Sequence, residues 1–512
     1  MLPYERTPLR ARGIMAHVAA EVATLATCDA IPTVDASELS PEQFLERYMR
    51  PNLPVMITGL TDGWRASRDW VSETTRDGSR VVDMRAMSEA FGAAEVLVVD
   101  CDEALDTDLA REQMRFDRYA DWWRARGDDP SRRASPDAPP RDRPNAKLYV
   151  KDWSMASDFP DYRAYVTPPH FADDWLNAYW DERAQSAAAS SPRHPERADP
   201  DPDPDPDPDP DPDPDGGGTH RFVYCGVEGT WTPLHADVLR SFSWSVNVVG
   251  RKRWLMVPPQ RSVHLLARDG SGRRPRDLAA AVAADPLDPE NPFPAARLSR
   301  PIVVDQPPGA AIFVPSLWYH QVHNLTDCVS VNHNWLNAAN ARLCWAMLRD
   351  ELAEVREGLP DPEDRGDGVL CQRLVARRAG ADYATFAGIL ASAIRRHARG
   401  EGKKNRSDAT SGSRKRRRNE ERGEDEDEHE AREGEGEEGE DVRSLGVAVG
   451  LLRQVLAADG DGDGDGDGDG GFDDAVVFVS GWEGREEALA SARDALEAGE
   501  AILARRDAPS ST

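Results

Sequence analysis

Short runs that alternate apolar and polar residues dominate residues 221–340 of this chain. Phe222–Cys225, for example, is rich in β-branched and aromatic residues, and glycine or proline separates such runs. Alternation of this kind is typical of strands with one buried face, and many short strands at this spacing predict an antiparallel sandwich or jelly roll. The runs Ser241–Val249 and Arg253–Val257 meet near Gly250, which predicts a hairpin between them.

Mixed patterns precede this region, and helical periodicity follows it. Ser40-Pro41-Glu42-Gln43 combines a capping serine, a first-turn proline and a returning glutamine, which predicts a helix start. Further strands are expected at Leu53–Gly59 and Leu148–Trp153, and further helices at Ala341–Glu357, Leu370–Arg399 and Trp482–Arg506. The predicted fold class is therefore α+β, mainly β with helices.

Three low-complexity stretches divide the chain and carry most of its net charge of −29. Alternating proline should keep the Asp-Pro run extended, Asp-Gly repeats should be flexible, and the charged tail has too few apolar residues to fold. We predict these segments: an N-terminal helical lead (1–28), an α/β part (29–198), an Asp-Pro/Gly linker (199–218), a β core (219–340), C-terminal helices (341–400), a disordered charged segment (401–441), and helical segments around an Asp-Gly linker (442–512, linker 459–471).

Composition excludes several classes of protein. Six scattered cysteines include no Cys-x-x-Cys pair, which argues against zinc-finger reader modules and a disulfide framework. No apolar run approaches the roughly 18 residues of a membrane span, and no basic stripe predicts direct nucleic-acid binding. We expect a cytoplasmic protein. The basic run Arg414–Arg418 is either a nuclear-localisation signal, which would add the nucleus, or a charged patch in a disordered tail.

The triplet His235-Ala236-Asp237 is the first candidate for chemistry. Side chains at i and i+2 of a strand point to the same face, so this imidazole and this carboxylate can bind one ion. Joined by a second histidine, they would form the facial triad suited to non-haem Fe(II), which leaves open positions for a keto-acid and O₂. His320 and His323 are both candidates for that second histidine, and they face opposite sides of a strand. His333 is a third, although a satisfied core histidine is its more ordinary interpretation.

A keto-acid such as 2-oxoglutarate also needs a cation for its distal carboxylate. Lys252 shares a strand face with Trp254 and Met256, which is a plausible inward-facing set, although lysine beside arginine is usually solvated. Thr232 is a candidate hydroxyl partner or an ordinary surface turn residue. Asn332 is a candidate amide partner from the last strand.

Taken in order, several motifs resemble the Jumonji-C oxygenases: Trp231–Asp237, Ser243-Trp244-Ser245, Gly250–Trp254 and Phe313–Asn324, with Pro54–Leu60 as the lead-in strand. The resemblance implies a double-stranded β-helix core, Fe(II) and 2-oxoglutarate as cofactor and co-substrate, and O₂. It implies His235, Asp237 and His320 as iron ligands. For 2-oxoglutarate it implies Lys252, Thr232 and Asn332, with Ser245 where relatives carry asparagine.

Within that family, Thr230–Pro233, Arg240–Trp244 and Asn332–Trp335 resemble a subgroup of lysyl hydroxylases that act on a translation termination factor. The implied function is hydroxylation of a protein side chain, with that factor as the protein substrate. Demethylation of N-methyl-lysine uses the same iron chemistry and stays an alternative. A non-catalytic cupin-like scaffold is a second alternative, and it would be expected to carry a broken triad.

Overall fold

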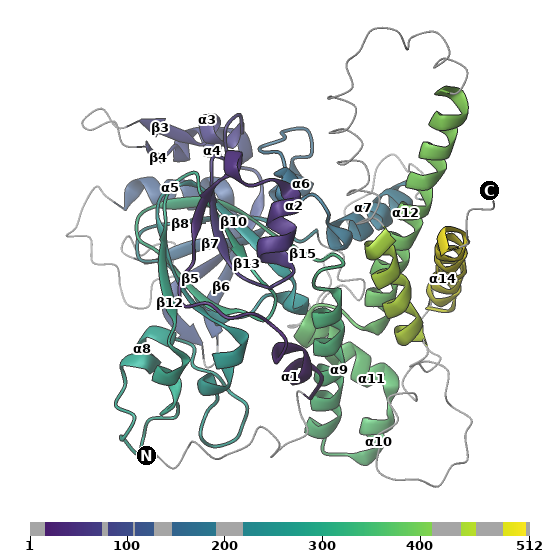
Figure 1. The fold of residues 1–512 in the computed structure, drawn as a ribbon. Helices are drawn as coiled ribbons and strands as arrows, with labels where there is room; N and C mark the ends of the chain where they lie inside the picture. The colour runs from purple at the N-terminus through teal and green to yellow at the C-terminus, as the bar shows by residue number, and fades with distance from the viewer. Residues whose placement is uncertain are drawn as a thin grey trace, which may run out of the picture. The chain divides into compact units, whose positions relative to one another are not determined.

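The computed structural model describes residues 16–73, 80–105, 108–126, 146–190, 219–411, 442–456 and 485–507. The chain divides into two compact units. The sheet unit comprises Glu21–Asp173 and Gly218–Trp335, and the helical unit comprises Met1–Ala20, Asp174–Gly217 and Leu336–Thr512 (Figure 1). Both predicted linkers (199–218 and 459–471) and the basic run Arg414–Arg418 lie wholly outside the described residues. The predictions made for them therefore stay predictions.

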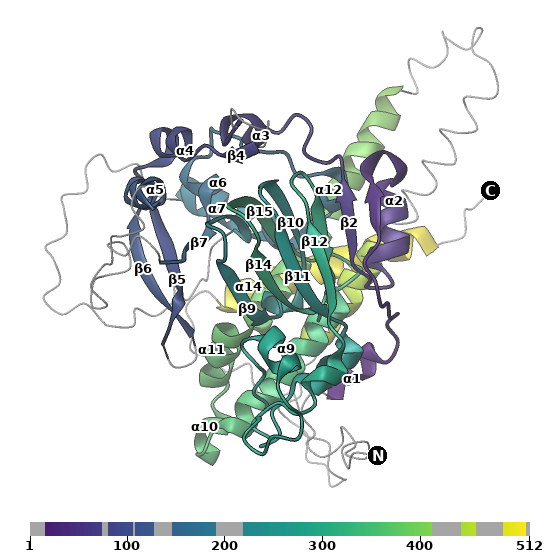
Figure 2. The same ribbon diagram turned by 90° about the vertical axis from the view of Figure 1, so that its left-hand side faces the viewer.

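Two sheets form the centre of the sheet unit. The larger has nine strands in the order β1 (Thr33–Asp35), β2 (Val55–Thr58), β13 (Ala311–Val314), β10 (Phe242–Val249), β15 (Cys328–Trp335), β8 (Arg221–Gly226), β7 (Leu148–Trp153), β5 (Glu95–Leu105) and β6 (Asp108–Arg115). The smaller has four, in the order β12 (Ile302–Gln306), β11 (Lys252–Val257), β14 (Tyr319–Asn324) and β9 (Trp231–His235), which Figure 2 shows side by side. A separate ribbon pairs β3 (Val71–Glu73) with β4 (Arg80–Val82).

The two sheets pack face to face, which confirms the predicted jelly roll and its α+β class. One buried cluster takes members from both: Trp254, Met256, Ile302, Trp318 and Val322 beside the four-stranded sheet, and Ile312 and Val314 from β13. Because strands alternate their side chains, the inward positions of β9, β10, β11, β14 and β15 share this interior. The site described below occupies the same interior.

The hairpin predicted at Gly250 is wrong. Strand β10 belongs to the nine-stranded sheet and β11 to the four-stranded one, so the chain crosses between sheets at this point. Gly250 adopts a φ of 90°, and a Cβ there would lie 2.2 Å from the Asp327 carbonyl oxygen. A glycine turn suits a hairpin and a sheet corner equally well, so the local sequence does not distinguish them.

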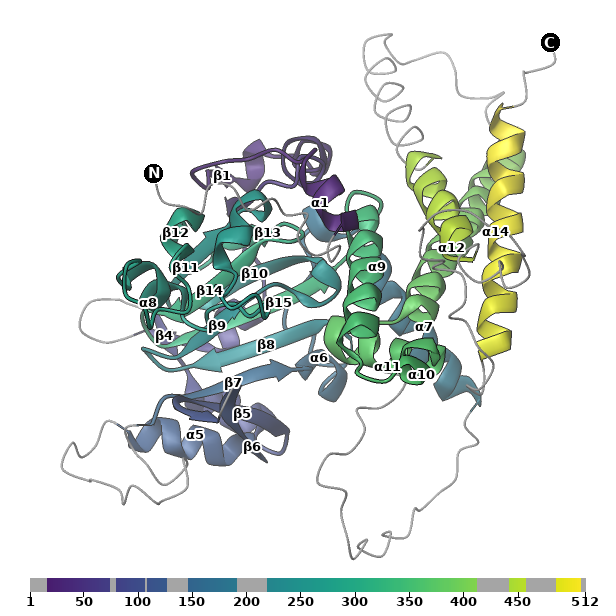
Figure 3. The ribbon, with the colours of Figure 1, turned by 90° about the horizontal axis from the view of Figure 1, so that it is seen from below.

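Short helices complete the sheet unit: α2 (Pro41–Phe44), α3 (Ala66–Asp69), α4 (Met84–Phe91), α5 (Phe116–Ala125), α6 (Met155–Asp158) and α8 (Leu278–Ala283). The predicted capping box at α2 is confirmed, since Ser40 and Gln43 exchange side-chain and backbone hydrogen bonds. Figure 3 shows β10, β15, β8 and β7 following one another from top to bottom, with α5 below β7 in this view.

The helical unit contains α7 (Trp175–Ser190), α9 (Ala341–Gly358), α10 (Pro362–Gly366), α11 (Gly368–Ala379), α12 (Tyr383–Ser411), a helix at 442–456 and α14 (Arg485–Asp507), with most of α1 (Ala16–Val22). The stretch Leu370–Arg399, expected to be helical, is divided between α11 and α12, because Gly380 takes a left-handed conformation and ends α11. Helix α12 continues to Ser411, eleven residues into the segment expected to be disordered, most of which lies outside the described residues. None of the described helices is long and apolar enough to span a membrane.

Candidate active site

Three metal-ligating side chains meet where β9 and β14 pair. His235 ends β9 and lies directly opposite His320 of β14, with their ring centroids 4.2 Å apart. Asp237 follows two residues after His235. One ligand atom from each of these three residues lies within 4.8 Å of the others. Two imidazoles and one carboxylate at this separation suit a divalent first-row metal with open coordination positions.

Backbone carbonyls orient both rings. The Nδ1 atom of His235 lies 2.8 Å from the Pro233 carbonyl oxygen, and that of His320 lies 3.1 Å from the Trp318 carbonyl oxygen. If each Nδ1 carries the proton, each Nε2 is left to bind a metal. Burial lowers the pKa of His235 to about 3, with neighbouring His320 adding to the effect, so the ring is in the neutral form that metals need.

The carboxylate ligand candidate is held from the facing sheet. Ser243 of β10 donates its hydroxyl to Asp237 Oδ2 at 2.7 Å. Directly after Asp237, Leu239 and Arg240 both have positive φ values of 54° and 49°. Such values are rare for residues other than glycine and cluster near functional sites. The chain thus makes a strained turn two residues after the carboxylate ligand candidate.

The other two histidines that the sequence left open lie elsewhere. His323 faces away from the interior, stacks on Trp231 at 5.7 Å and bonds to the Gln321 amide at 2.8 Å. His333 is buried, and its Nε2 atom lies 2.7 Å from the Tyr165 hydroxyl. The structure thus brings His320 alone of the three to His235 and Asp237.

A bulge brings Thr232 to the same face as His235. In a regular strand, residues three apart face opposite sides, yet Thr232 lies opposite Val322 while His235 lies opposite His320. The register shift adds one residue to β9, near Pro233, and turns both side chains inward. Spacing alone did not reveal this, because a bulge leaves no unique sequence signal.

Lys252 enters the same interior from β11. Its side chain is 3% exposed, and its Nζ donates to Ser330 Oγ at 2.8 Å and to the Tyr149 hydroxyl at 3.3 Å. In the part of the chain that the structure describes, no carboxylate contacts this ammonium group. A buried cation without an anion is costly, and burial lowers the pKa of Lys252 to about 8. The pocket is therefore suited to an anionic ligand.

Two further sequence candidates line the pocket. Asn332 donates to Ser330 Oγ at 3.1 Å, which places it beside the partner of Lys252. Ser245 lies directly opposite Asn332, is 3% exposed, and has a buried hydroxyl oxygen without a hydrogen bond in the described structure. Sequence reasoning missed Ser330 and Tyr149. Ser330 could have been predicted, because it is two residues from Asn332 in the same strand and therefore shares its face. Tyr149 could not, because it is distant in sequence.

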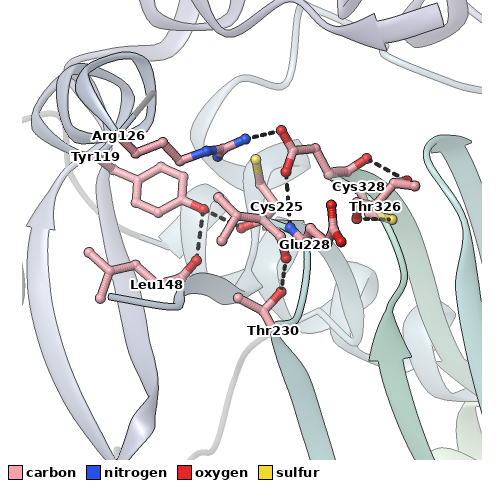
Figure 4. A network of polar contacts seen from close by, with 10 residues as sticks. Tyr119, Arg126, Leu148, Cys225, Glu228, Thr230, Thr326 and Cys328 are labelled. Atoms are coloured by element: carbon pink, nitrogen blue, oxygen red, sulfur yellow. Dashed lines mark hydrogen bonds and ion pairs between the residues drawn. The ribbon is translucent and has the colours of Figure 1, made fainter. Parts of the chain in front are cut away.

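A polar network joins the strands that carry some of the pocket residues (Figure 4). The Tyr119 hydroxyl of α5 lies 2.7 Å from the Cys225 carbonyl oxygen and 3.3 Å from that of Leu148, and thus ties β8 to β7. Arg126 pairs with Asp327, whose other oxygen accepts from the Glu228 amide at 2.9 Å. These contacts hold the ends of the strands that carry Tyr149 and Ser330.

Gly226 leaves no room for a side chain within this support. A Cβ there would lie 2.5 Å from Tyr149 and 2.7 Å from the Asn324 amide nitrogen. We expect Gly226→Ala to lower the free energy of unfolding by about 1–3 kcal/mol, as overpacking of a core does, measured by urea denaturation. Gly446→Ala is the control, since nothing lies within 4 Å of that position in a helix. Equal effects of the two changes would contradict the steric argument.

The sequence is similar to a known protein family and to several characterised relatives. The family model of the Cupin-like domain matches residues 41–341. The arginine-specific demethylase JMJ20 of Arabidopsis thaliana is 37% identical over 358 residues, which are 70% of this chain and 68% of that protein. The 2-oxoglutarate and iron-dependent oxygenase JMJD4 is 34% identical in Gallus gallus (68% of this chain, 70% of that protein) and 33% identical in Homo sapiens (63% and 65%).

Proposed function

Because the chain belongs to the Jumonji-C family of cupin-like, iron- and 2-oxoglutarate-dependent oxygenases, we propose that it hydroxylates a lysine side chain of a translation termination factor. The observation that carries the chemistry is the convergence of His235, Asp237 and His320 in the same interior as buried Lys252, which no carboxylate contacts within the described residues. The choice of lysine and of the termination factor rests on the subgroup motifs of the sequence. That substrate also favours a cytoplasmic location.

We assign Fe(II) to His235, Asp237 and His320, and the distal carboxylate of 2-oxoglutarate to Lys252. The donor set fits the metal, and an ammonium group buried without a carboxylate fits the co-substrate. Thr232, Asn332 and Ser245 are assigned as further polar contacts of 2-oxoglutarate. When bound, iron and 2-oxoglutarate supply the oxidation: decarboxylation of the keto-acid by O₂ is coupled to insertion of one oxygen atom into a C–H bond.

The chain's own residues orient the candidate metal ligands and exclude water from around them. The Trp254 ring lies 5.6 Å from the His320 ring, and Met256 and Val322 are buried beside it. These apolar neighbours exclude water around the ligand histidines and strengthen the electrostatic contacts of the site. The backbone carbonyls of Pro233 and Trp318 keep both imidazoles oriented for one ion.

Removing the hydroxyl that holds Asp237 tests this arrangement. We expect Ser243→Ala to weaken Fe(II) binding by about 10–100-fold, since hydrogen-bond partners of metal ligands typically matter by that much. The measurement is the Fe(II) concentration for half-maximal 2-oxoglutarate turnover. Ser241→Ala, directly before the same strand, is the control, because its hydroxyl contacts Asn334 rather than Asp237. An unchanged iron requirement in Ser243→Ala would remove the assigned role.

Demethylation is the second candidate reaction, because one similar relative is named an arginine-specific demethylase. It requires the same site acting on an N-methyl group, and the residues around the triad do not separate the two outcomes. The scaffold alternative predicts a broken triad, whereas the three candidate ligands here converge.

Mass spectrometry of the termination factor after incubation with the protein, Fe(II) and 2-oxoglutarate tests the proposal. We expect one added oxygen on a lysine residue, dependent on 2-oxoglutarate and absent with His235→Ala. Loss of methyl groups from methylated lysine or arginine peptides, with release of formaldehyde, would favour demethylation instead. Turnover of 2-oxoglutarate at the same background rate in wild type and His235→Ala would favour the scaffold.

A further inference from the structure

Asp152 lies in a strained position at a bulge of β7. Its φ is 54°, in the left-handed region that aspartate tolerates better than most residues but still seldom adopts. The pairing of β7 with β8 shifts register between Val150 and Trp153, so Asp152 sits in the irregular segment. Bulges next to active sites commonly redirect one side chain. Here the bulge directs the Asp152 carboxylate to a residue of the interior.

That interior residue is Tyr224, whose hydroxyl donates to Asp152 Oδ1 at 2.6 Å. Tyr224 lies directly opposite Ser330, the partner of Lys252, and its ring centroid is 5.9 Å from Lys252 Nζ. Burial raises the pKa of Tyr224 well above its usual value, and the charges of Asp152 and Asp237 add to this effect. Tyr224 therefore stays a neutral donor beside Lys252, and its hydroxyl holds the Asp152 carboxylate in place.

The Asp152 carboxylate has no cation partner within the described residues. Its side chain is exposed, and within the described part of the chain its carboxylate accepts a hydrogen bond from Tyr224 alone. By contrast, the carboxylates of Asp305 and Asp69 in the same unit each pair with an arginine, Arg253 and Arg65, at 2.7 Å. The chain neighbour Lys151 approaches the Tyr149 ring, 6.0 Å from its centroid. An anion that is held in place by a residue of the Lys252 pocket, and has no cation partner among the described residues, is available to a cationic ligand.

We propose that Asp152, positioned by Tyr224, receives the cationic end of the target side chain and so restricts the reaction to lysine or arginine residues. The inference rests on the proposed function and deepens it, because it names Asp152 as the residue that recognises the positive charge of the substrate. A lysine ammonium or an arginine guanidinium keeps its charge when hydroxylated or N-methylated, so this contact would serve either reaction. Asp152 acts on the bound substrate, and Tyr224 acts through Asp152 as a positioning residue.

The test compares Asp152→Asn and Tyr224→Phe with wild type on a lysine peptide from the termination factor. We expect kcat/KM to fall about tenfold to a hundredfold for Asp152→Asn, mainly through KM, because a hydrogen bond between charged groups is lost. Tyr224→Phe should lose several-fold. Asp102→Asn is the matched control, an exposed carboxylate on the neighbouring strand β5 that pairs with Lys147 instead. Thermal stabilisation by 2-oxoglutarate shows that each variant is folded.

The outcomes separate this inference from the proposed function. An unchanged KM for the peptide in Asp152→Asn, with wild type active, overturns the inference and leaves the function standing. If wild type hydroxylates no lysine of the termination factor, the function falls. The same variants are then compared on a methylated arginine peptide, where the same loss supports the inference. Activity of wild type on neither peptide overturns both.

Discussion

Replacing His320 by alanine is expected to lower turnover of 2-oxoglutarate to succinate by more than about 100-fold, whereas His323→Ala should keep most of it. His320 is one of three converging metal-ligand candidates, and loss of a ligand should exceed the roughly 10–100-fold effect of losing a ligand's hydrogen-bond partner. His323 lies on the same strand but faces outward, stacked on Trp231. Succinate formation and bound iron, measured on the purified variants, check this result.

His323→Ala is a matched control for His320→Ala, because each variant removes one imidazole from β14. His320→Ala also opens space beside Trp254, so folding is verified by the melting temperature of each variant. A second ligand variant, Asp237→Ala, should reproduce the loss from the other side of the site. Full activity in His320→Ala, or equal loss in His323→Ala, would contradict the assignment of the iron ligands.

Lys252→Met is expected to raise the KM for 2-oxoglutarate by about 30-fold or more without lowering the melting temperature of the ligand-free protein. Truncating one partner of a buried charge pair costs about 2 kcal/mol or more, and each 1.4 kcal/mol is tenfold in affinity. Without ligand, however, methionine removes a buried ammonium that no carboxylate balances. Initial rates across 2-oxoglutarate concentrations and thermal melts measure the two effects.

The same lysine predicts a pH dependence. Its pKa is lowered by burial to about 8, from an ordinary 10.5, so the ammonium form that attracts a carboxylate is lost above about pH 8. The KM for 2-oxoglutarate should therefore rise as pH increases through 8. Between about pH 8 and 10.5 the unfolded chain binds more protons at this site than the folded chain does. Stability without ligand should consequently gain with pH in that window, and Lys252→Met should lose this gain.

Arg253→Ala is the control for Lys252→Met. Arg253 is the next residue on β11 but faces outward, half exposed in an ion pair with Asp305. Exposed pairs of this kind contribute little to stability, and the side chain does not reach the pocket. A KM for 2-oxoglutarate that is unchanged in Lys252→Met, or raised equally by Arg253→Ala, would show that the anion binds elsewhere.

The sequence by itself determined the elements and the ligand pair that local spacing controls. Alternating apolar residues predicted the strands, and the capping pattern at Ser40 predicted the start of α2, because each depends on contacts within a few residues. His235 and Asp237 were candidates for one ion because strand geometry places i and i+2 on one face. The motif order indicated the family, which the comparisons show.

Only the tertiary structure decided which distant groups meet. It brought His320 rather than His323 to His235, because strand register selects one face of β14. It turned Thr232 inward through a bulge, sent the chain across to the other sheet at Gly250, and placed Tyr149 against Lys252 from 103 positions away. Register, bulges and sheet pairing depend on contacts between segments far apart in the chain, and a local pattern of residues does not encode them uniquely.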